Sequence, residues 1–126
     1  MKSLSYLAIG MALGAFATSA ADRVTTLDPV KVSPEYYSVR LENDRIRVLE
    51  YRLKPGDKEA MHSHLPGVVY VLANATLRSA TSEGASSETS RKAGEVFWRE
   101  STTHTAENVG ATEAHGLAIE LKPCGQ

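Results

Sequence analysis

Apolar and polar residues alternate in short runs through most of the chain. The runs are rich in Val, Ile, Tyr, Leu and Thr, and turn residues such as Asn43-Asp44 and Pro55-Gly56 separate them. Alternation with a period of two residues predicts β-strands with one buried face. The expected strands span residues 36–43, 45–53, 59–64, 68–75, 76–82, 87–91, 95–100, 104–109 and 115–122.

Beyond residue 21, no stretch of the chain shows the periodicity of a helix. Short strands at spacings of about ten residues, with no helices between them, are typical of an antiparallel sandwich or barrel. Residues 68–72, VVYVL, are apolar on both faces and therefore predict a central strand. Residues 22–35 contain two prolines, and we expect them to form an arm that pairs along a sheet edge.

The first 21 residues differ from the rest of the chain. After Lys2 no charged residue occurs before Asp22, and the segment ends in small residues. This is the layout of a secretory signal peptide. The apolar run is shorter than the roughly 20 residues that a membrane helix needs. We therefore expect cleavage after Ala20 or Ala21 rather than a retained helix. The expected product is a periplasmic or secreted protein without a stable membrane anchor.

The composition fits one globular domain, expected over residues 22–126. The chain has 126 residues, of which 42% are hydrophobic and 23% charged. Fourteen basic and fifteen acidic residues give a net charge of −1, and no block of like charge occurs. The basic footprint of a nucleic-acid-binding protein is therefore absent from the sequence. The single cysteine, Cys124, cannot form a disulfide within the chain.

Two of the four histidines lie two residues apart, in His62-Ser63-His64. Alternate residues of a strand point to the same side, with α-carbons roughly 6.6 Å apart. A metal lies about 2.0–2.1 Å from each imidazole nitrogen, so such a pair can hold one from one side. The pattern alone is weak, because an ordinary strand with two polar residues also shows it.

The histidines belong to two spaced motifs, Gly56-x5-His62-x-His64 and Gly94-x9-His104-x3-Asn108. This spacing resembles the two conserved motifs of the cupin superfamily, and the chain is similar to small single-domain bacterial cupins. The resemblance covers residues 43–122, about the length of the expected barrel. It implies an all-β fold, an antiparallel jelly-roll barrel, in which His62, His64 and His104 converge on one metal.

Strand geometry agrees with this arrangement. His104, Ala106 and Asn108 share one face of their strand, so His104 can point into the barrel. Three inward histidines need partners, because a buried polar group without one is costly. A divalent cation would satisfy all three, and a water-filled polar pocket is the alternative. We expect Asn108, Tyr70 and Trp98 to form parts of the pocket wall.

The sequence departs from the cupin pattern in the fourth ligand. Cupins usually supply a glutamate shortly after the second histidine, but residues 65–69 contain no carboxylate. The second motif also has Glu100 and Thr102 where Pro and Gly are usual. We therefore expect three histidine ligands, with Glu100 as the one candidate for an extra ligand. His115 is expected at the rim or surface. Arg99 and Arg52 are expected in solvent, with carboxylate binding as the alternative.

Three neutral imidazoles would leave a bound ion with its full charge and with open coordination positions. Such a site suits Fe, Zn, Ni or Cu, and favours small anionic or enolisable ligands. With iron it resembles the three-histidine dioxygenases of the superfamily, and with zinc an isomerase-like or hydrolytic role follows. The alternative is a metal-free cupin that binds a small ligand or serves as a structural dimer unit. Small cupins commonly pair through sheet edges, so the resemblance also implies a homodimer.

Overall fold

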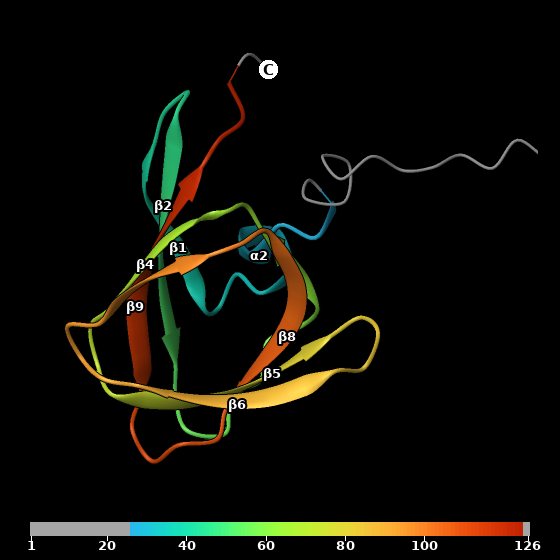
Figure 1. Cartoon of the computed structure of the whole chain (residues 1–126), viewed down its shortest axis with the longest axis vertical. Coiled ribbons are helices and arrows are strands. Elements are labelled where there is room, and N and C mark those ends of the chain that lie inside the picture. Colours follow the sequence, from blue (N-terminus) through green and yellow to red (C-terminus); the bar gives the residue numbers. More distant parts are fainter. Residues whose placement is uncertain (1–25, 125–126) are drawn as a thin grey trace, which may run out of the picture.

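The computed structural model describes residues 26–124, which form two antiparallel β-sheets. One sheet has five strands in the order β1-β2-β9-β4-β7, and the other has four in the order β3-β8-β5-β6. Figure 1 shows β1, β2, β4 and β9 on one side of a barrel, with β5, β6 and β8 across from them. The predicted all-β jelly-roll fold is confirmed.

Most strand bounds agree with the alternation pattern to within two residues, but β3 begins three residues later and β4 ends four residues earlier than expected. β4 pairs with β9 on one side and β7 on the other, as expected of an apolar central strand. In chain order the strands are β1 (Tyr37–Glu42), β2 (Ile46–Leu53), β3 (His62–His64), β4 (Gly67–Val71), β5 (Ala75–Thr81), β6 (Ser86–Arg91), β7 (Val96–Arg99), β8 (Thr102–Asn108) and β9 (Ala114–Leu121).

The arm contains a helical turn, so the expectation of no helix is wrong there. α2 spans Pro29–Val32, and the Asp28 side chain caps it by accepting a hydrogen bond from the Val30 amide at 3.1 Å. An aspartate cap followed by a proline at the first helical position favours a helix start. Just before it, the Leu27 carbonyl accepts a hydrogen bond from the Ser63 amide at 2.8 Å. The described part of the arm, residues 26–35, thus contacts β3, an edge strand.

The predicted signal peptide, residues 1–21, lies outside the described residues. Across residues 26–124, none of the helices has the length and apolar character needed to cross a membrane. The boundary of the domain at residue 22 stays a prediction.

The first glycine of each histidine motif has a local structural reason. Gly56 and Gly94 have φ angles of 88° and 90°, in the left-handed region that glycine adopts without a steric penalty. Both lie in tight turns, in which the amides of Asp57 and Glu95 donate to carbonyls three residues earlier. These turns direct the chain towards β3 and into β7, and so help to place the histidine strands.

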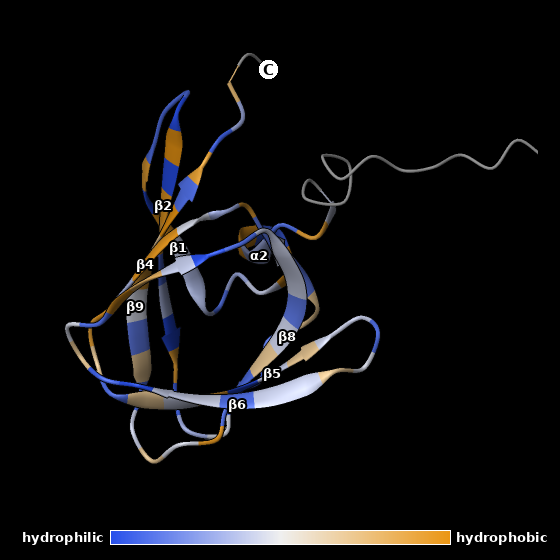
Figure 2. Cartoon of the chain, in the orientation of Figure 1, coloured by the Kyte–Doolittle hydropathy of each residue, from blue (hydrophilic) through white to orange (hydrophobic). Residues whose placement is uncertain are grey.

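The side chains of β9 show how the interior is packed. Its buried positions are the small residues Ala114, Gly116 and Ala118, together with Glu120. Its larger apolar residues occupy the alternate positions and are less buried. Figure 2 shows hydrophobic and hydrophilic residues alternating along β1 and β2, whereas β6 is pale and hydrophilic. The alternation predicted the strands correctly, but the side that faces inwards is not always the more hydrophobic one.

Candidate metal centre

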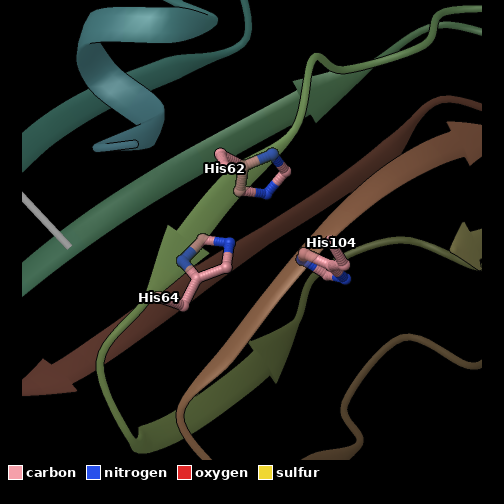
Figure 3. A group of neighbouring side chains, drawn as sticks. All are labelled: His62, His64 and His104. Atoms are coloured by element: carbon pink, nitrogen blue, oxygen red, sulfur yellow. The ribbon is translucent and has the colours of Figure 1, made fainter. Parts of the chain in front are cut away.

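Three histidines from two neighbouring strands meet inside the barrel. β3 carries His62 and His64, and it pairs with β8 so that His62 lies directly opposite His104. Figure 3 shows the three rings projecting from these strands towards one another. One possible ligand nitrogen from each ring lies within 4.8 Å of the other two. The predicted convergence is confirmed, and the cluster could hold a metal ion.

Hydrogen bonds fix the orientation of two of the rings. His62 and His64 are 0% and 1% exposed. The Nδ1 atom of His62 donates to the Ala60 carbonyl at 2.7 Å, and the Nδ1 atom of His64 donates to the Glu120 carboxylate at 2.7 Å. A proton on Nδ1 leaves the lone pair on Nε2 free to bind a metal. Partners of this kind orient metal-binding histidines in proteins.

The Nε2 atoms lack adequate partners within the protein. Those of His64 and His104 are buried without a hydrogen bond. That of His62 has the Tyr37 hydroxyl and a Glu59 oxygen near it, each at a long 3.4 Å. An unsatisfied buried polar group costs about 1–3 kcal/mol. A divalent cation would satisfy all three nitrogens at once, so the residues present fit a metal.

The electrostatic environment keeps the imidazoles neutral. Burial lowers the pKa of His62, and burial together with the Arg99 charge lowers the pKa of His64 well below its usual value. Burial, with a smaller contribution from His62, lowers the pKa of His104 to about 3. Neutral imidazole is the form that binds metals, so no proton has to be displaced from these nitrogens near pH 7.

A cavity of about 180 Å³ opens beside the cluster. Its polar lining includes Glu59, His64, His104 and Arg99. The rest of the wall is mainly apolar, from residues such as Leu53, Val69, Val71, Ala73, Leu77, Phe97 and Ala106. Ligand pockets for drug-sized molecules commonly measure about 300–1,000 Å³, so this cavity suits a smaller ligand.

Solved structures share this fold. A cupin domain from Bordetella pertussis Tohama I is 30% identical over 69% of this chain and 92% of that chain, with a TM-score of 0.63. The chain belongs to the cupin superfamily.

More distant structures agree with the fold of this cupin. A protein with a double-stranded β-helix domain from Klebsiella pneumoniae is 21% identical, with a TM-score of 0.52 over 69% of this chain and 75% of that one. An RmlC-like cupin family protein from Methanocaldococcus jannaschii is 7% identical, with a TM-score of 0.54 over 68% and 77%. No protein-family model and no curated protein matches the chain.

Sequence reasoning missed a buried ion-pair network behind His64. Glu120 is 0% exposed, and Arg47 donates to its Oε2 atom from Nε at 3.2 Å and from Nη2 at 3.0 Å. Arg47 also donates to Asp28 at 2.8 Å. Burial raises the pKa of Glu120, and the Arg47 charge opposes that shift. The network holds the carboxylate that orients the His64 ring. Its one sequence signal is a charged residue within the apolar run of β9.

Sequence reasoning also missed Glu59, three residues before His62. Its side chain is buried, with one oxygen 3.4 Å from the His62 Nε2 atom and the other without a hydrogen bond. Burial raises the pKa of this carboxyl to about 7, against the opposing effect of a hydrogen bond with Tyr37. Glu59 thus places a carboxylate beside the cluster, although the chain lacks the glutamate that cupins usually have after the second histidine. Glu59 instead precedes the first histidine of the motif.

Four of the predicted site residues lie outside the cluster and its cavity, and three of these four are exposed. Glu100 is exposed and accepts a hydrogen bond from the Trp98 indole at 2.7 Å, so the prediction that it is an extra ligand is wrong. Tyr70 and Trp98 are 39% and 51% exposed and do not line the cavity. Both side chains point out of the barrel, because their neighbours along the strand line the cavity instead. These neighbours are Val69 and Val71 for Tyr70, and Phe97 and Arg99 for Trp98.

Asn108 is buried but does not line the cavity, so the prediction that it forms part of the pocket wall is wrong. Its side-chain amide donates to the carbonyls of Leu53 at 2.9 Å and Thr112 at 2.8 Å, and its oxygen accepts from the Gly110 amide at 3.0 Å. These bonds hold the end of β8 against the end of β2 and against the loop that follows β8. The asparagine of the second motif is therefore a structural residue here.

Proposed function

We propose that this cupin binds one divalent transition metal, Fe, Zn, Ni or Cu, through the Nε2 atoms of His62, His64 and His104. Two observations carry the proposal: each ring offers one nitrogen within 4.8 Å of the other two, and the Nε2 atoms of His64 and His104 are buried without a hydrogen bond. Three neutral ligands leave coordination positions open for a small anionic or enolisable ligand.

The surrounding residues suit such a ligand. When bound, a metal of this kind supplies Lewis-acid or redox chemistry to a molecule in the cavity. Ala60 and Glu120 hold two of the rings in place, so little reorganisation is needed. The cavity walls are mainly apolar, and Glu59 offers an oxygen that has no hydrogen bond within the protein.

For the reaction, we propose a dioxygenase-like oxidation if the metal is iron, and an isomerase-like activity if it is zinc. The all-histidine ligand set and the small, largely apolar cavity support both. We further propose that the protein acts in the periplasm or outside the cell, because residues 1–21 have the layout of a signal peptide.

Metal content is the first test. The full chain would be expressed without a histidine tag, and the processed protein analysed by elemental mass spectrometry. We expect about one equivalent of metal per chain, and loss of that metal in His62→Ala and in His104→Ala. His115→Ala is the matched control, because the His115 ring bonds to Glu50 at 2.7 Å, outside the cluster. Substoichiometric metal that none of the variants changes would support the metal-free alternative.

A further inference from the structure

Arg99 is a charged residue that lines the cavity beside the three histidines. Arg99 is the last residue of β7 and lies opposite Gly67 of β4, which in turn lies opposite Glu120 of β9. Gly67 leaves no room for a side chain, because a Cβ there would meet the backbone of Ile119. The Arg99 guanidinium lines the cavity, close to the Glu120 carboxylate that orients His64.

Arg99 is a largely buried cation without a close partner. Its side chain is 19% exposed, and its Nε atom is buried with no hydrogen bond. Its ion pair within residues 26–124 is with Glu120, at 3.6 Å from Nη2 to Oε1, beyond hydrogen-bond range. Arg47 and His64 already hold that carboxylate with shorter bonds. Since burying an unpaired charge is unfavourable, the site is suited to an anion from outside.

The second arginine of the cavity wall is different. The guanidinium of Arg91 stacks on the Phe97 ring at 3.9 Å from the centroid, and it pairs with Glu95 at 3.5 Å. Its side chain is 38% exposed, so water also solvates it. The Phe97 ring and water therefore compensate the charge of Arg91, whereas the Arg99 side chain is only half as exposed.

A metal in the histidine cluster would increase the demand for negative charge. The three imidazoles are neutral, so the two positive charges of the ion would add to the charge of Arg99. Glu59 is the carboxylate of the cavity lining, and one of its oxygens already lies 3.4 Å from the His62 Nε2 atom. An anionic ligand would balance this charge, and a guanidinium matches the two oxygens of a carboxylate better than an ammonium does.

We propose that Arg99 binds the carboxylate of the ligand, and that the ligand is a short carboxylic acid with a second oxygen donor directed at the histidine cluster. This inference rests on the function proposed above for the same site. One oxygen of Glu120 lies 2.7 Å from the His64 ring and 3.6 Å from the Arg99 guanidinium, so a short carbon linker separates the two ends of the ligand. The apolar wall, which includes Val69 and Ala106, suits that linker.

The test compares two probes of nearly equal shape, acetoacetate and pentane-2,4-dione. Both can chelate a metal through oxygen, but only acetoacetate has a carboxylate. Calorimetric titration would be carried out on the wild type, Arg99→Gln, Arg99→Lys and Arg91→Gln, after the metal content of each has been measured. We expect Arg99→Gln to bind acetoacetate about tenfold to hundredfold more weakly and the dione unchanged. We expect Arg99→Lys to be intermediate, and Arg91→Gln to weaken acetoacetate binding less than Arg99→Gln does.

The outcomes separate this inference from the proposed function. A metal-loaded wild type that does not prefer acetoacetate, or an Arg99→Gln variant that binds it as the wild type does, would overturn the inference alone. Equal weakening of both probes would also overturn it, because Arg99 would then act only by supporting Glu120. If Arg99→Gln does not fold, unchanged acetoacetate affinity in Arg99→Lys has the same meaning. If the wild type is metal-free and binds acetoacetate, and Arg99→Gln does not bind it, the inference is supported and the proposed metal function is overturned.

Discussion

Two neighbouring rows of residues, on opposite faces of the five-stranded sheet, have opposite compositions. On the outside, large apolar residues lie opposite one another across all five strands, in the row Leu41, Val48, Ile119, Val68 and Trp98. The neighbouring inward row crosses four of these strands and consists of Arg47, Glu120, Gly67 and Arg99. Glu120 is 0% exposed, whereas Trp98 is 51% exposed. The usual distribution of charged and apolar residues is thus reversed in this part of the sheet.

This difference shows where the molecule departs from what stability alone would favour. Buried charges are unfavourable unless they are paired, and exposed apolar patches commonly mark surfaces that another molecule covers. The inward row is paired in part, through Arg47 and Glu120, and it supports the histidine cluster. We therefore attribute the inner row to the site and the outer row to association.

The largest expected effect comes from breaking the inner row. Glu120→Ala leaves Arg47 buried without its main partner and the His64 ring without an acceptor. We expect a loss of about 3–5 kcal/mol in the free energy of unfolding, and metal affinity about tenfold to hundredfold weaker. Urea unfolding and metal titration measure the two. Leu121→Ala, the next residue, points outwards and is 42% exposed, so it serves as the control with little change. Equal losses in both variants would contradict the comparison.

The pH dependence of the metal-free protein is the next expected effect. In the folded state the pKa of His104 is about 3, below its value of 6.5 in an unfolded chain. Between these values the unfolded state binds more protons, so the free energy of unfolding falls as the pH falls. The pKa of Glu59 is raised from 4.5 to about 7, so it contributes the opposite trend between pH 7 and pH 4.5.

Urea unfolding at several pH values between 7 and 4.5 tests both signs. We expect His104→Gln to lose less stability than the wild type as the pH falls. We expect Glu59→Gln to lose more, because it lacks the carboxyl that takes up a proton on folding. Parallel pH profiles in all three proteins would show that these buried groups do not control the acid sensitivity.

We expect a substitution in the outer row to change stability little but association strongly. We propose that a second copy of the chain packs on this face, because a two-fold axis would place the same apolar row on both partners. Trp98→Lys should then shift the sedimentation coefficient from that of a dimer to that of a monomer. Its metal content should not change, and stability should change by about 0.5 kcal/mol or less. A monomeric wild type, or a dimeric variant, would refute this proposal.

The smallest expected effect is that of Tyr70→Ser. The ring points outwards from β4 and does not line the cavity. Metal content and acetoacetate affinity should therefore equal those of the wild type, as measured by the same two assays. A marked loss of either would mean that the outer face contributes to the site.

Much of the fold and half of the site followed from the sequence. Alternation with a period of two predicts each strand, because it depends only on neighbouring residues. The resemblance of the two spaced motifs to those of cupins identified His62, His64 and His104 for a similar reason, because the residues of each motif lie close together along the chain. The capped turn of α2 was the one described element missed, although Asp28 and Pro29 are ordinary signals for a helix start.

Only the tertiary structure decided which side of each strand faces inwards. An alternating pattern has two sides, and β9 turns its small residues and Glu120 to the interior. For the same reason Tyr70 and Trp98, aromatic residues expected in the pocket, lie outside. The groups around the histidines come from strands far apart in the chain, with Arg47 on β2, Arg99 on β7 and Glu120 on β9. A buried charge is tolerated only when partners from distant parts of the chain lie next to it, and the local sequence does not show which residues these partners are.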